Sequence, residues 1–136
     1  MSTEHVQPGR GLRWIPLVLW LAVVPILLLS PEAASVGWLE RLLRGLHPAV
    51  VTFLDTSADK VIHAVLFAIG AWLFHRAAWP LAAAVLAAVL YGGAMELIQH
   101  AFPPRTPEWL DAAANTLGSC GYGLWVLGSR HWRRIR

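Results

Sequence analysis

Four long apolar segments constrain this chain more than any other feature of its sequence. They cover residues 14–30, 59–76, 79–100 and 109–129. An α-helix needs about 20 apolar residues, with a range of about 17–25, to cross the hydrocarbon core of a bilayer. The sequence therefore predicts an all-α, polytopic membrane protein with four transmembrane helices. The second segment is the weakest of the four, because only 15 residues separate Lys60 from Arg76, and it spans only if these two side chains reach opposite interfaces.

The composition argues against an ordinary soluble domain. Hydrophobic residues make up 57% of the chain and charged residues only 14%, whereas a soluble domain has about 25% charged residues. A soluble fold of this size would have too little polar surface to cover itself. The length fits one domain and not two, so we predict a single membrane domain over residues 1–136.

The uneven distribution of Lys and Arg predicts the orientation of the helices. With both termini in the cytoplasm, seven of the eleven basic residues lie on the inner side, as the positive-inside rule favours: Arg10, Arg13, Arg76, Arg130, Arg133, Arg134 and Arg136. The outer side then holds Arg41, Arg44, Lys60 and Arg105. Because each basic cluster flanks an apolar segment, the same rule explains the clusters without nucleic-acid binding.

Local signals mark the ends and connections of the helices. The first segment is long for a signal peptide and lacks a clear cleavage site, so we expect it to be retained. Pro25 predicts a kink inside that segment, and Pro80 predicts the start of the third helix. Between the first two segments, residues 32–56 carry apolar side chains at helical spacing, which predicts a short amphipathic helix in the membrane interface. These are Val36, Leu39, Leu42, Leu43 and Leu46.

Polar residues from distant parts of the sequence fall at one depth in this topology, near the outer surface. They are Asp59, Lys60, His63, Glu96, Gln99, His100, Arg105, Asp111 and Asn115. Residues three or four apart share a helix face, as do Asp59 with His63 and Asp111 with Asn115. Ionisable groups at membrane depth are costly and therefore mark candidate functional sites. On the third helix, small residues at every fourth position precede Glu96, so we expect Glu96 to face another helix.

Three motifs resemble the VanZ-like family of bacterial membrane proteins in order and spacing. They are Asp59-Lys60-x-x-His63, Glu96-x-x-Gln99-x-x-Phe102-x-x-Arg105 and Asp111-x-x-x-Asn115-x-x-Gly118. The resemblance covers roughly residues 59–123. It implies a compact multi-pass protein of the bacterial cytoplasmic (inner) membrane, belonging to the cell envelope. The family takes its name from a protein associated with low-level teicoplanin resistance, so the resemblance implies a link to glycopeptide susceptibility.

The chemistry of these residues leaves three functions open. In the first, the protein binds an anionic envelope lipid or a lipid-linked cell-wall precursor, because Arg105 and Lys60 are cations able to hold a phosphate. In the second, it is a hydrolase or transferase acting on a lipid phosphate. The third is a structural subunit of a membrane complex. The catalytic residues of an enzyme would be His63, Glu96 and Asp111, and the substrate-binding residues would be Asp59, Lys60, Gln99, Arg105 and Asn115.

The sequence contains no compact metal-binding motif, and we predict no cofactor. A divalent metal remains an alternative, because a carboxylate or imidazole ligand is available at Asp59, His63, Glu96 and Asp111. The single cysteine, Cys120, lies in an apolar stretch and is interpreted as a packing residue. The oligomeric state does not follow from the sequence.

Overall fold

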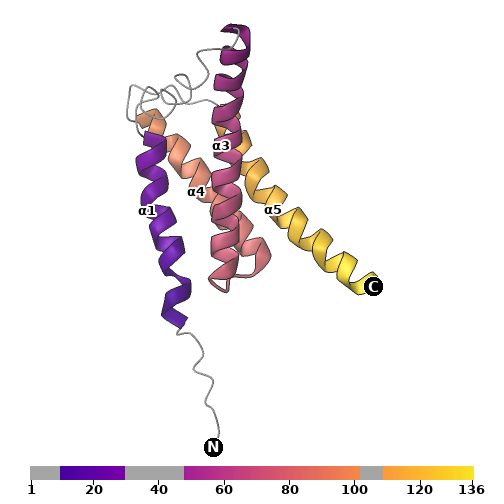
Figure 1. The fold of residues 1–136 in the computed structure, drawn as a ribbon. Coiled ribbons are helices and arrows are strands. Elements are labelled where there is room, and N and C mark those ends of the chain that lie inside the picture. Colours follow the sequence, from indigo (N-terminus) through magenta and orange to yellow (C-terminus); the bar gives the residue numbers. More distant parts are fainter. Residues whose placement is uncertain (1–9, 30–47, 102–108) are drawn as a thin grey trace, which may run out of the picture.

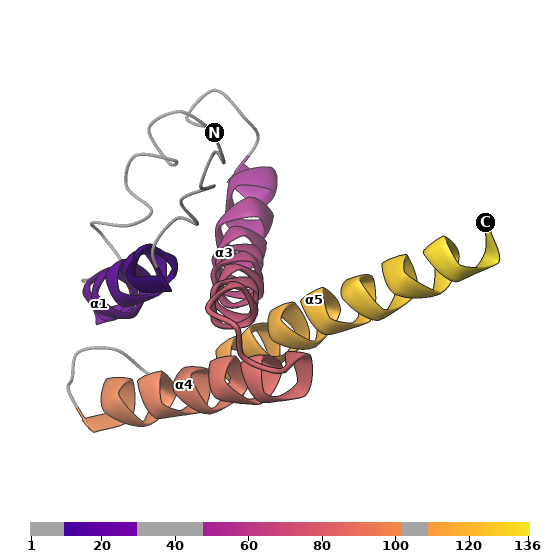
Figure 2. The same ribbon diagram turned by 90° about the horizontal axis from the view of Figure 1, so that it is seen from below.

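The structure, a computed structural model, describes residues 10–29, 48–101 and 109–136. These residues form a 3-10 turn, η1 (Arg10–Arg13), and four α-helices: α1 (Ile15–Leu29), α3 (Pro48–Arg76), α4 (Leu81–Ala101) and α5 (Trp109–Ile135). The described residues contain no β-strand, so the predicted all-α class is confirmed. In Figures 1 and 2, α3 lies between α1 and α5, and the last turns of α5 extend away from the other helices.

Two of the helices contain segments that are long and apolar enough to cross a membrane, Ala58–Arg76 in α3 and Leu81–Ala101 in α4. They match the predicted second and third spans to within two residues. The other two predicted spans are helical, but they do not meet the same test. α1 has 15 residues and is about 22 Å long, against a hydrocarbon core of about 30 Å. α5 is long enough, but its polar and glycine residues make it less apolar.

Two helices extend beyond the predicted segments. α3 begins at Pro48 rather than near Asp59, because Pro is favourable in the first helical turn and residues 49–58 contain neither Gly nor Pro. Residues 48–56 of the predicted interfacial helix are therefore part of α3, and the remainder of that prediction lies outside the described residues. α5 continues to Ile135 instead of ending near residue 129.

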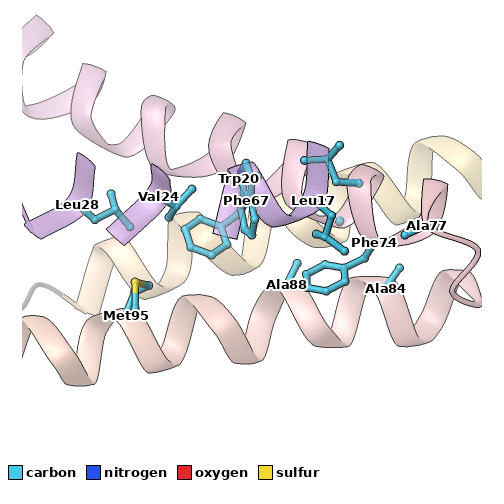
Figure 3. Close-up of a cluster of buried hydrophobic side chains, with 12 residues drawn as sticks. Leu17, Trp20, Val24, Leu28, Phe67, Phe74, Ala77, Ala84, Ala88 and Met95 are labelled. Atoms are coloured by element: carbon cyan, nitrogen blue, oxygen red, sulfur yellow. The ribbon is translucent and has the colours of Figure 1, made fainter. Parts of the chain in front are cut away.

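The hydrophobic core lies where α1 packs against α3 and α4 (Figure 3). α1 contributes a stripe at helical spacing, Leu17, Trp20, Val24 and Leu28, which meets Phe67 and Phe74 of α3 and Ala84, Ala88 and Met95 of α4. The opposite face of α1 is also apolar, and Val18, Leu19 and Ile26 are exposed on it. A helix that is apolar on all sides is typical of a membrane environment.

Pro25 has a specific structural consequence within α1. Since proline has no N–H, it leaves the carbonyl of Leu21 without its usual helical donor. The hydroxyl of Tyr91 on α4 donates to this carbonyl at 2.8 Å. Trp20 Nε1 donates to the carbonyl of Leu66 on α3 at 3.2 Å. The proline thus creates an acceptor that helps to attach α1 to α4.

A tight turn makes α3 and α4 antiparallel neighbours. Ala78 adopts φ 72°, and the N–H groups of Ala78 and Trp79 donate to the carbonyls of His75 and Phe74. This is a Schellman motif, in which a residue in the left-handed region ends the helix. The Phe74 and Trp79 rings pack together at 5.3 Å between centroids. Pro80 accepts the first hydrogen bond of the next helix, from Ala84 N, as its predicted position at the start of that helix requires.

Candidate functional site

Six of the predicted site residues converge at one end of the bundle, where α3, α4 and α5 meet. This polar cluster consists of Asp59, Lys60, His63, Glu96, Asp111 and Asn115. They come from three helices, α3, α4 and α5. α3 and α5 approach closely beside the cluster, since a Cβ on Gly118 would lie 1.9 Å from the carbonyl oxygen of Ala64.

An ammonium group joins two carboxylates on one side of the polar cluster. Lys60 Nζ contacts Asp59 Oδ2 on its own helix at 3.3 Å, and it also forms an ion pair with Asp111 on α5. Asp111 is buried, and the Lys60 side chain retains 22% of its exposure. Asp111 therefore acts as more than the cap of α5, because it pairs with a charge on another helix.

A hydrogen-bonded chain of three side chains forms the other side of the cluster. Asn115 Nδ2 donates to Glu96 Oε1 at 3.1 Å, and Asn115 Oδ1 lies 3.0 Å from His63 Nδ1. The amide nitrogen of Asn115 is used toward Glu96, so the amide oxygen, which only accepts hydrogen bonds, faces His63. His63 Nδ1 therefore carries the proton and donates it to Asn115. In the neutral imidazole, His63 Nε2 is then left with its lone pair.

Two buried polar atoms of the cluster have no hydrogen-bond partner in the described chain, His63 Nε2 and Glu96 Oε2. His63 is 1% exposed, and its Nε2 atom lies 3.9 Å from Asp59 Oδ1. A buried polar atom that lacks a partner typically costs about 1–3 kcal/mol. In a native structure such atoms commonly bind a ligand, an ion or a water molecule.

The polar cluster is tightly packed on the side of Gly92 and Ser119. A Cβ on Gly92 would lie 3.0 Å from both Asn115 Cβ and Phe67 Cε1. The Ser119 hydroxyl donates to the Asn115 carbonyl at 2.9 Å and lies 3.4 Å from the Phe67 carbonyl. Little space is therefore left around Asn115, whose side-chain amide lies between His63 and Glu96.

The remaining predicted residues lie elsewhere. Gln99 shares the α4 face of Glu96 only in part, and its Nε2 atom donates to the Leu28 carbonyl at 2.8 Å, at the end of α1. His100 is exposed. Arg105 lies outside the described residues, as does Glu108. Gly118 is a packing residue at the crossing of α3 and α5.

Sequence reasoning did not anticipate a second polar contact at the opposite end of α3. His75 Nδ1 lies 2.8 Å from the Tyr122 hydroxyl on α5, and Arg130 reaches His75 Nε2 at 3.5 Å. Helical spacing cannot pair residues that are 47 positions apart in the sequence. The only available signal was that His75 and Arg130 both flank apolar segments at the predicted inner side.

The described polar cluster has an excess of negative charge. Asp59, Glu96 and Asp111 supply three carboxylates, and Lys60 supplies the one ammonium. With His63 neutral and the acids ionised, the net charge is therefore about −2. This negative net charge attracts a cation. An anionic group would bind here only with the help of positive charge from outside the described cluster.

Comparisons of the chain with protein family models, curated proteins and solved structures found no significant match. The candidate site is therefore defined by the motifs and by the geometry of its own residues. The site is partly buried and contains one imidazole, three carboxylates and one ammonium. Two of its buried atoms, His63 Nε2 and Glu96 Oε2, have no hydrogen-bond partner among the described residues.

Proposed function

We propose that this chain is a VanZ-like protein of the bacterial cytoplasmic membrane that binds an envelope lipid or a lipid-linked cell-wall precursor by its head group. The polar cluster is the proposed binding site. The observation that carries the proposal is the pair of buried atoms without a hydrogen-bond partner in the described chain, His63 Nε2 and Glu96 Oε2, at one end of the helix bundle. Hydroxyl and ammonium groups of a head group are donors that would satisfy both atoms.

The surface of the bundle supports its placement in a membrane. In the most apolar 18 residues, only 33% of Ala58–Arg76 and 22% of Leu81–Ala101 are buried inside the protein. The core helix of a soluble protein would be mostly buried. Large apolar side chains such as Leu90, Leu97, Leu117 and Leu124 are instead exposed. We propose that all four α-helices cross the membrane, with the short α1 covered by lipid on its exposed face.

The proposed orientation places both termini in the cytoplasm. α3 ends at Arg76, and the C-terminal turns of α5 carry Arg130, Arg133 and Arg134. In Figure 1 these helix ends lie at the end of the bundle where α1 begins. The positive-inside rule then puts this end in the cytoplasm. The polar cluster comes from the opposite ends of α4 and α5, so it faces the outer leaflet.

The phosphate of such a lipid would be held by Lys60 together with Arg105. Arg binds phosphate through two parallel hydrogen bonds, and Lys acts as a mobile point charge. The resemblance motif places Arg105 six residues before Asp111, on the connection that leads into α5. Two cations are needed because the described cluster is acidic. A link to teicoplanin susceptibility rests on the family resemblance, and the susceptibility of a deletion strain would test it.

One observation favours a second candidate, a hydrolase or transferase acting on the same lipid phosphate. The chain from Glu96 through Asn115 to His63 holds the imidazole in the tautomer whose Nε2 atom can accept a proton. In this reading His63 would act as general base. Turnover of a lipid phosphate that is lost in His63→Gln would support it, and an unchanged lipid would count against it.

The binding proposal is tested by native mass spectrometry of lipids that co-purify with the protein. We expect a phosphorylated lipid on the wild type and its loss from Arg105→Ala. Arg130→Ala is the matched control, because Arg130 lies on the same chain at the other end of α5, near His75. Equal lipid occupancy in all three proteins would refute head-group binding through Arg105 at the polar cluster.

A further inference from the structure

We propose that Asp59, His63 and Asp111 form a binding site for one divalent transition-metal ion, Zn²⁺ or Mn²⁺. One ligand atom from each residue lies within 4.8 Å of the other two. They come from two helices, α3 and α5, whose close crossing at Gly118 fixes their separation. This inference stands on the geometry alone and does not depend on lipid binding.

The imidazole of His63 is already arranged as a metal ligand. Its Nδ1 atom donates to Asn115 Oδ1 at 3.0 Å, so in the neutral imidazole the lone pair resides on Nε2. A histidine that binds a metal almost always donates its other ring N–H to an oxygen acceptor, which fixes its tautomer and orientation. His63 Nε2 is buried without a hydrogen-bond partner, 3.9 Å from an Asp59 oxygen. A lone pair and a carboxylate oxygen facing each other repel unless a cation lies between them.

Lys60 supplies a cation to this site in the metal-free chain. Its ammonium contacts both Asp59 and Asp111, the same carboxylates that would bind the ion. A metal–oxygen bond of about 2.1 Å is shorter than an ammonium–oxygen contact of about 2.8 Å. Replacement of the ammonium by a metal would therefore draw the ligand atoms closer together. Lys60 is partly exposed, so its long side chain is able to move toward the membrane surface.

The ligand set and the charge select the class of metal. One imidazole nitrogen and two carboxylate oxygens suit Zn²⁺ and Mn²⁺, whereas Mg²⁺ and Ca²⁺ prefer oxygen ligands alone. A divalent ion would offset the excess negative charge of the polar cluster. Glu96 Oε2, which has no hydrogen-bond partner among the described residues, is a further carboxylate oxygen of the polar cluster that would be able to accept a hydrogen bond from a metal-bound water.

The proposal is tested on the full-length protein in detergent, without an affinity tag, after removal of metals with a chelator. Titration with Zn²⁺ or Mn²⁺ should load about one ion per chain on the wild type. His63→Gln should lose this ion, and His75→Gln should retain it. His75 is the matched control because it lies on the same helix but pairs with Tyr122 instead. Equal loading of both variants would overturn the proposal.

Lys60→Met provides an independent test, in which metal binding should become tighter instead of being lost. If Lys60 occupies the carboxylates in at least about nine chains of ten, its removal should tighten metal binding by about tenfold or more. An unchanged affinity would contradict competition for the same site.

The wild type also provides a test that needs no variant. Pulsed electron paramagnetic resonance of bound Mn²⁺ should detect one imidazole nitrogen in the coordination shell. Its absence would overturn the assignment of His63. Binding of Mg²⁺ or Ca²⁺ in place of Mn²⁺ would do the same.

Discussion

Substitution of Gly118 by alanine should separate the two helices that carry most of the polar cluster. A Cβ at this position would lie 1.9 Å from the carbonyl oxygen and 2.6 Å from the carbonyl carbon of Ala64. Both atoms belong to the backbone of α3, so no change of rotamer relieves the overlap. Ordinary contact begins near 3.4 Å, and α3 and α5 must therefore move apart locally by about 1.5 Å.

The size of the effect follows from two contributions. Forcing an extra carbon into a packed core costs about 1–3 kcal/mol. The same displacement stretches the hydrogen bond between His63 and Asn115, which is 3.0 Å long and lies within one turn of the crossing, at a cost of about 1 kcal/mol. Alanine favours the helix over glycine by about 1 kcal/mol. The net loss is about 1–3 kcal/mol, which lowers the melting temperature by roughly 3–10 °C for a chain of this size.

Thermal unfolding in detergent, followed by the fluorescence of the eight tryptophans, would measure this loss. Gly121→Ala is the matched control, because Gly121 lies on the same helix and its Cβ would have no neighbour within 4 Å. We expect Gly121→Ala to melt at or slightly above the wild-type temperature. If Gly118→Ala melts within about 1 °C of Gly121→Ala, the close crossing of α3 and α5 is wrong.

Three further substitutions test separate parts of the structure by the same measurement. Ala78→Gly should stabilise the protein by about 1 kcal/mol, since glycine adopts φ 72° without strain; a lower melting temperature would contradict the turn. Tyr91→Phe should cost about 1–2 kcal/mol, because it leaves the carbonyl of Leu21 unpaired. This cost should fall below about 0.5 kcal/mol in a Pro25→Ala background, where the restored N–H satisfies the carbonyl; equal costs in both backgrounds would refute the role of the proline. Asn115→Ala should cost about 2–5 kcal/mol, because an imidazole and a carboxylate lose their shared partner, and a neutral effect would exclude that network.

The sequence was sufficient to locate the helices, because uncharged runs of helical length are a strong and simple signal. It was less able to locate their ends. An apolar run marks where a bilayer would begin, whereas a helix continues until the backbone is interrupted. α3 therefore extends back to Pro48, and α5 continues through its arginines to Ile135.

Side-chain partners were harder to predict than positions. Glu96 and Gln99 are three residues apart, and at about 100° per residue their directions differ by about 60°. This difference is enough for Glu96 to contact α5 while Gln99 contacts the end of α1. Contacts such as Tyr91 to Leu21 also require knowledge of which helices are neighbours, and helical periodicity contains no such information.

Bulky substitutions at Gly92 or Gly118 do not report on an interface with another subunit. A Cβ at either position meets atoms of this same chain, Asn115 and Phe67 for Gly92 and Ala64 for Gly118. Loss of function in such variants is therefore expected for a binding protein, an enzyme or a structural subunit alike. The polar residues above these glycines are the ones whose substitution separates the three functions.

The polar cluster is held in place mainly by helix packing. His63 adjoins Ala64 at the close crossing, and Asn115 lies one turn from Gly118. The Ser119 hydroxyl donates to the backbone carbonyl of Asn115 and lies 3.4 Å from that of Phe67. Backbone contacts of this kind do not rearrange when a side chain loses a ligand. His63 Nε2 and Glu96 Oε2 thus stay in position while unsatisfied. A metal ion bound by Asp59 and Asp111 would displace the Lys60 ammonium from these carboxylates, whereas a lipid phosphate would bind that ammonium. In both cases only side chains would move, so little of the binding energy would be spent on reorganising the helices.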